Sequence, residues 1–299
     1  MKDNLKEVSI EGLELIGKGS CGTVYRLDED KIIKVFNEDF YTDLIELEDS
    51  NAKKSFFAGV NTAISYGIVK VGNCFAIIYE AINGDTVRQV VEREPEKKEY
   101  LISEYAKLGR QMHETCAKDM GIPRSESLWF GPDSIDKVNK YLDEEEKKQL
   151  KQFLLDIPKK DSFVHGDYHI GNLLYADNRV VLIDMTTISV GHPIYDFAGI
   201  YLTGLIPELY RTVLPGTFPD SFLDNARNTW DIFLREYFKD KTKEERDRIE
   251  LEIRPYSLIR LLQISTNKLL NAHPDAIYIK AKELLMDILQ DDNWPKLSF

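Results

Sequence analysis

One short stretch, FVHGDYHIGNLLY at residues 163–175, restricts the fold of this chain more than any other part. It places Asp167 and Asn172 five residues apart between apolar flanks, a pattern typical of a functional loop that core residues anchor at both ends. The next apolar run, VVLI, reads as a strand and ends on Asp184. Carboxylate and amide oxygens are hard ligands that suit Mg²⁺ and do not suit zinc or copper. The spacing therefore predicts a site that holds a phosphoryl donor, metal ions and an acceptor hydroxyl around one point.

The composition narrows the class of protein. The chain has 299 residues, of which 43% are hydrophobic and 30% charged, so it can bury a large core in one or two domains and is not expected to be disordered. The net charge of -12 argues against a nucleic-acid partner, because nucleic-acid phosphates favour basic surfaces. The same charge is compatible with a cationic substrate.

The cysteines and the apolar runs indicate where the protein acts. Cys21, Cys74 and Cys116 lie far apart without a CxxC pair, which indicates neither a zinc site nor a disulfide framework and favours a reducing compartment. The amino terminus has no apolar signal core, and the longest apolar stretch, at 197–206, is too short to span a bilayer. We therefore expect a cytoplasmic protein without membrane contact, present as a monomer or a weak dimer.

The periodicity of the chain changes near residue 84. Residues 1–84 read as strands with one helical stretch at about 40–58, whereas residues 85–299 repeat apolar side chains at helical spacing. This order predicts an α+β protein with two lobes, a small sheet lobe with one helix followed by a larger helical lobe. The helical stretches are expected at 98–117, 143–156, 221–239, 242–271 and 276–290.

The first lobe contains a glycine-rich segment that matches GxGxxGxV. It falls between two strand-like runs, whereas the same glycines in a dinucleotide fold should open a helix. The glycines would let backbone N–H groups close over phosphates, although a flexible hairpin without a ligand would have the same pattern. The residues concerned are Gly17, Gly19, Ser20, Cys21, Gly22 and Val24.

Lys34 lies within the apolar strand-like run IIKVF, where a buried lysine needs an acidic partner. The helical stretch at 40–58 offers Glu46 and Glu48. Glu48 shares its helical face with apolar residues, whereas Glu46 lies among polar ones. We therefore predict an ion pair between Lys34 and Glu48.

Together these segments resemble the protein-kinase-like superfamily, and specifically the aminoglycoside phosphotransferase and choline kinase group. The resemblance extends from about residue 14 to 200, and it implies a bilobal kinase-like fold with a small antiparallel sheet in the first lobe. It is carried by the glycine loop at 17–24, Lys34, Glu48, a hinge at 79–84, HGDxHxxN at 165–172 and the Ile-Asp pair at 183–184.

The resemblance also implies a role for each matched residue. Asp167 would be the catalytic residue that accepts or orients the acceptor hydroxyl, and Asn172 and Asp184 would hold Mg²⁺. Lys34 would meet the phosphates of ATP or GTP, with Glu48 orienting it. Backbone groups of Glu80 and Ile82 would meet the purine, His165 would brace the loop, and Asp196 would accept backbone N–H bonds from it.

Three classes of function remain open at this point. A kinase of a small hydroxylated metabolite or antibiotic is the leading interpretation, and a non-catalytic nucleotide-binding pseudokinase is the alternative. A protein kinase fits less well, because only eleven residues separate Asp184 from Asp196 and Gly166 precedes Asp167 where protein kinases have Arg. The acceptor, the choice of ATP or GTP and the oligomeric state are not encoded in these motifs.

Overall fold

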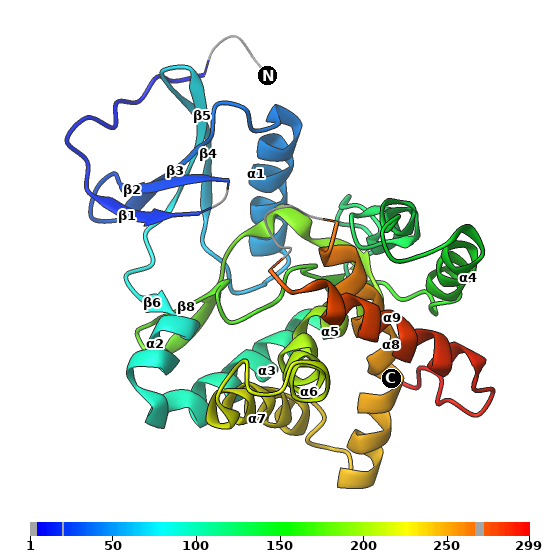
Figure 1. Cartoon of the computed structure of the whole chain (residues 1–299). Coiled ribbons are helices and arrows are strands. Elements are labelled where there is room, and N and C mark those ends of the chain that lie inside the picture. The colour runs from blue at the N-terminus through cyan, green and yellow to red at the C-terminus, as the bar shows by residue number, and fades with distance from the viewer. Residues whose placement is uncertain (1–4, 20, 267–271) are drawn as a thin grey trace. The chain divides into compact units, whose positions relative to one another are not determined.

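A computed structural model of the chain describes residues 5–19, 21–266 and 272–299, and Figure 1 shows their course. The residues form two compact units. Unit 1 comprises Met1–Lys97 and Ile170–Ile188, and unit 2 comprises Lys98–His169 and Ser189–Phe299. Each unit is thus built from two separate segments of the chain. The predicted division into lobes at 1–84 and 85–299, which rests on the periodicity of the sequence, stays a prediction.

Unit 1 is centred on a five-stranded antiparallel sheet with the strand order β1-β2-β3-β5-β4 (Figure 1). Helix α1 (Thr42–Phe57) packs against β4 and β5 and buries Ile45 and Ala52. The core below it includes Ile33 and Ile77, which are fully buried. The strands are β1 (Leu15–Lys18), β2 (Gly22–Arg26), β3 (Lys31–Phe36), β4 (Ser65–Val71) and β5 (Cys74–Glu80).

A second, three-stranded sheet in unit 1 has the order β6-β8-β9, with β6 at Asp85–Thr86, β8 at Leu173–Ala176 and β9 at Arg179–Leu182. Asp177 and Asn178 join β8 to β9 with φ angles of 49° and 58°, the left-handed backbone that a two-residue hairpin turn needs. Helix α2 (Val87–Arg93) and the 3₁₀ turn η1 (Pro95–Lys97) follow β6. The hydroxyl of Thr62 donates to the carbonyl of Leu182 at 2.8 Å, which ties this sheet to the loop before β4.

Unit 2 is mostly helical. Helix α3 packs against α7, and α8 packs against α5 and α9 (Figure 1). Aromatic side chains that include Phe197, Tyr201, Trp230 and Phe233 fill its core. The helices are α3 (Lys98–Glu114), α4 (Glu144–Leu155), α5 (Ile194–Ile200), α6 (Leu202–Val213), α7 (Asp220–Tyr237), α8 (Lys243–Ile264) and α9 (Asp275–Gln290). Short strands β7 (Ser162–Val164) and β10 (Ser189–Gly191) pair with each other, and 3₁₀ turns lie at η2 (Ser125–Ser127) and η3 (Pro132–Lys137).

The predicted α+β order, an antiparallel sheet with one helix followed by a mainly helical region, is confirmed. The helix predicted at 242–271 ends at Ile264, and residues 267–271 lie outside the described part of the chain. Helices α5 and α6 were not among the predicted helices. Within the described ranges, no helix combines the length and the apolar character that crossing a membrane requires.

Candidate active site

Strand β3 and helix α1 bring Lys34 and Glu48 together in unit 1. Lys34 Nζ donates to Glu48 Oε1 at 2.7 Å, and their side chains are 18% and 2% exposed. The predicted ion pair is therefore confirmed, and Glu46, on the other face of α1, is exposed as the helical spacing indicated. Burial opposes the charged form of Lys34, but the carboxylates of Asp184 and Glu48 hold its pKa above the ordinary value. The ammonium therefore stays charged.

Both carboxylate oxygens of Glu48 have partners. The hydroxyl of Tyr79, at the end of β5, donates to Oε1 at 2.8 Å, and Thr186 Oγ1 lies 2.8 Å from Oε2. Burial and the negative charge of Glu48 raise the pKa of Tyr79 well above its ordinary value, so its hydroxyl keeps its proton. Two donors, from β3 and β5, together with the hydroxyl contact from Thr186 thus hold a buried carboxylate in place.

Asp184 follows strand β9 in a strained backbone conformation. Its φ of 64° lies in the left-handed region, which a residue with a side chain seldom adopts and which is concentrated at functional sites. The carbonyl of Asn172 accepts the Ile183 N–H at 3.0 Å, so the backbones of the two proposed metal ligands are adjacent. The side chain of Asp184 contacts Thr186, and its Oδ1 lies 2.8 Å from Thr186 Oγ1.

The chemistry of these two residues fits Mg²⁺. In proteins Mg²⁺ is commonly held by one or two carboxylates together with substrate phosphates and water, and not by a complete protein cage. Asp184 supplies a carboxylate and Asn172 an amide oxygen on neighbouring backbones. In the described part of the chain, no three His, Cys, Asp or Glu side chains gather as metal ligands.

The glycine segment forms the hairpin between β1 and β2. Gly17 pairs with Val24, and the Gly19 N–H donates to the Gly22 carbonyl at 2.9 Å. A Cβ on Gly22 would lie 2.2 Å from the Val35 carbonyl oxygen, so packing against β3 requires glycine there. Two further residues of the predicted loop are Cys21, which is half-buried at the tip, and Ser20, which lies outside the described residues.

The predicted hinge at 79–84 begins at Tyr79, the residue before the end of β5. The Glu80 N–H donates to the Ile64 carbonyl at 2.9 Å, and the Ile82 carbonyl accepts the Gly84 N–H at 3.0 Å. These bonds engage one backbone group of each residue.

In unit 2, Asp196 on α5 holds the loop that carries Asp167. It is fully buried and accepts the Gly166 N–H at 2.6 Å on Oδ1 and the His165 N–H at 2.9 Å on Oδ2. His113 Nε2 also donates to Oδ2 at 2.9 Å, and its Nδ1 lies 2.9 Å from the hydroxyl of Tyr237. Burial alone would raise the pKa of the Asp196 carboxyl, but the hydrogen bonds from the His113 ring and the His165 N–H hold that pKa below its ordinary value. The predicted role of Asp196 as acceptor for the loop is confirmed.

The residues on each side of Asp167 are firmly held. Gly166 has a φ of 83°, a left-handed conformation that favours glycine. Tyr168 and Tyr105 of α3 exchange hydrogen bonds, each hydroxyl donating to the other residue's carbonyl at 2.7 Å. The Asp167 carboxylate is about half exposed and lies 3.6 Å from His169 Nε2. An accessible carboxylate on an anchored loop suits contact with an acceptor.

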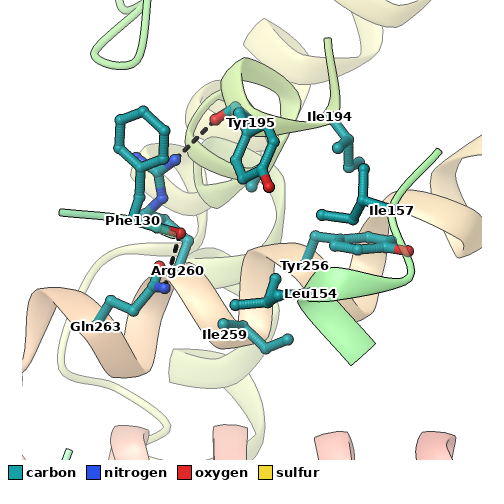
Figure 2. A pocket seen from close by; sticks show the side chains of 10 residues that line it. Phe130, Leu154, Ile157, Ile194, Tyr195, Tyr256, Ile259, Arg260 and Gln263 are labelled. Atoms are coloured by element: carbon teal, nitrogen blue, oxygen red, sulfur yellow. Dashed lines mark hydrogen bonds between the residues drawn. The ribbon is translucent and has the colours of Figure 1, made fainter. Parts of the chain in front are cut away.

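A buried guanidinium lies behind the same loop. Arg260 of α8 is only 4% exposed and donates to the carbonyls of Gly166 at 3.2 Å and Tyr195 at 2.8 Å. It also stacks on the rings of Trp129 and Phe130, and Figure 2 shows Phe130 and Tyr195 around it. Burial lowers the pKa of Arg260 to about 10 against the influence of Asp196 and Asp167, so it is charged at neutral pH. Arg260 thus bonds the residues that immediately precede two carboxylates of unit 2.

The cavity beside Arg260 is small. Its volume is about 10 Å³, room for at most one water molecule, and its walls are mostly apolar (Figure 2). It is therefore a packing defect in the helical core and not a substrate pocket.

The sequence of this chain matches the model of one known protein family. The model of the phosphotransferase enzyme family, APH, matches residues 62–239. The chain belongs to this family. No curated protein sequence matches it.

Solved structures with the same fold include three different kinases. The ADP-bound aminoglycoside phosphotransferase APH(2'')-Ib has 17% identity and a TM-score of 0.52, and the match covers 93% of this chain and 92% of that one. The Plasmodium vivax ethanolamine kinase has 13% identity and a TM-score of 0.53, with 94% of this chain and 82% of that one covered. A putative fructosamine-3-kinase from Haemophilus somnus has 15% identity and a TM-score of 0.56, with 91% of this chain and 90% of that one covered. At these identities the likeness shows the fold alone. The predicted protein-kinase-like fold is confirmed.

Three residues of this family member were missed from the sequence. Thr186 and Tyr79 were not identified as partners of Glu48, and Arg260 was not connected to the loop at Gly166. The one available signal was Thr186 itself, a hydroxyl placed two residues after Asp184 where protein kinases usually have glycine.

Proposed function

We propose that this protein is a small-molecule kinase that transfers the γ-phosphate of ATP or GTP to a hydroxyl of a small amino or hydroxylated acceptor. The observation that carries the proposal is the network around Glu48. A buried carboxylate orients a charged lysine and connects, through Thr186, to Asp184. A protein that only packed its core would have no need for this arrangement, because burying charged groups costs free energy.

Unit 1 contains the residues proposed to bind the nucleotide. The hairpin at Gly19 and Gly22 would cover the phosphates, and Lys34 would donate to them. Asn172 and Asp184 would hold Mg²⁺, which supplies charge neutralisation when bound. The Glu80 carbonyl and the Ile82 N–H would accept from and donate to the purine.

Asp167 is the proposed catalytic residue. During transfer, a bond forms between the acceptor oxygen and the γ-phosphorus, and the bond from that phosphorus to the bridging oxygen of the leaving diphosphate breaks. Asp167 orients the hydroxyl and receives or passes on its proton. Because such transition states are loose, positioning and charge neutralisation contribute more than proton abstraction.

A pseudokinase is the second candidate, and the contacts disfavour it. Lys34, Glu48 and Asp184 are all present and connected, and the loop that carries Asp167 is anchored by Asp196. A protein kinase is disfavoured by the segment between Asp184 and Asp196, which contains only a 3₁₀ turn (η4, Met185–Thr187), the strand β10 and the start of α5.

The acceptor is proposed at the level of chemical class. The net charge of -12 favours a cationic molecule. The solved relatives are named for an aminoglycoside, for ethanolamine and for fructosamine, each of which carries an amine and at least one hydroxyl. We therefore favour an amino alcohol or amino sugar, acted on in the cytoplasm by a monomer or weak dimer.

The experiment is a nucleotide-consumption screen with ATP and GTP against aminoglycosides, choline-like amines, macrolides and sugars. Asp167→Ala should lower turnover by several orders of magnitude while nucleotide affinity stays near that of the wild type. Tight nucleotide binding without consumption for any acceptor would favour the pseudokinase. Equal loss of binding and turnover in Asp167→Ala would contradict the assigned role.

A further inference from the structure

Thr186 contacts two carboxylates of unit 1 to which the proposed function gives different tasks. Its Oγ1 lies 2.8 Å from Glu48 Oε2 and 2.8 Å from Asp184 Oδ1. Glu48 orients Lys34, whereas Asp184 is the proposed metal ligand. A threonine hydroxyl has one proton, and ionised carboxylates only accept, so Thr186 can donate to only one of them at a time.

The surroundings keep the Thr186 hydroxyl between the two acids. Asn51, one helical turn after Glu48 on α1, donates to the carbonyls of Met185 at 3.0 Å and Thr186 at 3.4 Å. Glu48 Oε1 already accepts from Lys34 and from Tyr79 at the opposite end of the carboxylate. Helix α1 therefore holds both the backbone of the Thr186 segment and one of its two acceptors.

This arrangement leaves one oxygen contact unfavourable. When the proton points to Glu48, the lone pairs of Oγ1 face Asp184 Oδ1 at 2.8 Å, and the reverse holds when it points to Asp184. A divalent cation bound to Asp184 would neutralise much of the negative charge of that carboxylate. Asp184 would then no longer compete with Glu48 for the proton of the Thr186 hydroxyl. The hydroxyl would then donate to Glu48 alone.

We propose that Thr186 is a positioning residue that couples Mg²⁺ binding at Asp184 to the orientation of Glu48, and through Glu48 to that of Lys34. The inference rests on the proposed function, because it assumes a nucleotide bound with its metal at Asp184. Coupling of this kind is reciprocal, so an oriented Glu48 also favours the metal.

The test measures how much Mg²⁺ increases the affinity for a non-hydrolysable ATP analogue, by calorimetric titration with and without the metal and without an acceptor. In full-length Thr186→Val, the metal-free affinity should stay within about twofold of the wild type, whereas the gain from Mg²⁺ should fall by roughly tenfold, the value of one hydrogen bond to a charged group. Thr186→Ser keeps the hydroxyl and should retain most of the gain.

Tyr79→Phe is the matched control. It removes a hydroxyl that donates to the other oxygen of the same Glu48 carboxylate. We expect its gain from Mg²⁺ to stay within about twofold of the wild-type gain, because Tyr79 does not bridge to Asp184. In a Glu48→Gln background, Thr186→Val should have little further effect on the gain, since the coupling passes through Glu48.

The outcomes separate the two proposals. An unchanged or larger Mg²⁺ gain in Thr186→Val, or an equal loss in Tyr79→Phe, would overturn the coupling while nucleotide binding by the wild type still supported the kinase assignment. A wild-type protein that bound no nucleotide with or without Mg²⁺ would overturn the proposed function, and the coupling with it.

Discussion

Replacing Asp196 by Asn keeps the size of the side chain and removes its charge and one of its two acceptor oxygens. If the amide oxygen takes the Oδ1 position, the NH₂ group faces the His165 N–H and His113 Nε2. If it takes the Oδ2 position, the NH₂ group faces the Gly166 N–H. His113 can exchange tautomers and accept, but a backbone N–H cannot. In either orientation, one N–H of the loop before Asp167 loses its acceptor.

The cost follows from those contacts. A hydrogen bond to a charged acceptor contributes about 1.5–3 kcal/mol, and leaving a buried donor unpaired costs about 1–3 kcal/mol. These two quantities overlap, so we expect Asp196→Asn to lower the free energy of unfolding by roughly 3 kcal/mol at pH 7. Turnover should fall as well, because the same N–H groups fix the loop that carries Asp167.

Urea denaturation of both proteins measures the difference, with Asp287→Asn, an exposed change on α9, as the control. The pKa of Asp196 is lowered in the folded protein, so its stabilising contribution is present above the pKa of an unfolded Asp, about 4, and is lost as the pH falls through the folded value. The difference in the free energy of unfolding between the wild type and Asp196→Asn should therefore become smaller below about pH 4. Equal stability of the two proteins at pH 7, or a gap that widens in acid, would refute the reasoning.

Three further substitutions test other parts of the molecule. Glu48→Gln should lower turnover by tenfold or more in a steady-state assay, whereas Glu46→Gln, on the exposed face of α1, should change it little; the reverse order would contradict the assignment of the ion pair. Arg260→Lys should lower the free energy of unfolding by about 1–3 kcal/mol, because an ammonium cannot span two carbonyls as a guanidinium does. It should also lower kcat more than it raises KM. An unchanged kcat would limit Arg260 to a packing role. Gly22→Ala should lower the melting temperature, because its Cβ would meet a backbone carbonyl at 2.2 Å, whereas Gly17→Ala, with its nearest contact at 3.8 Å, should not; similar melting temperatures for the two would argue against the close packing.

The parts of the site that were predicted correctly are those whose residues lie on one periodic element. Glu48 was distinguished from Glu46 because helical spacing alone decides which faces the sheet. Asp167, Asn172 and Asp184 stand out in the sequence because they occur within one short stretch. Their assignment as catalytic and metal-binding residues stays a proposal.

Long-range partners could not be predicted in this way. Thr186 is 138 residues from Glu48, and Arg260 is 94 residues from Gly166, so no local pattern relates them. Helix α5 was missed for a different reason. Six of its seven residues, including Asp196, are buried, so the helix has no polar face and no amphipathic period to detect.

The discontinuous order of unit 1 has a consequence for recombination within the family. Residues 98–169 interrupt unit 1, and the border between His169 and Ile170 falls inside the HGDxHxxN stretch. A fragment that ends at residue 97 would lack β8 and β9, whereas one that joins it through a linker to residues 170–188 would regain both strands. Exchanging residues 98–169 with those of a relative would import a new Asp167 and leave the native Asn172 and Asp184 in place. Chimaeras cut at these two borders would therefore separate inheritance of the proposed catalytic carboxylate from inheritance of the proposed metal ligands.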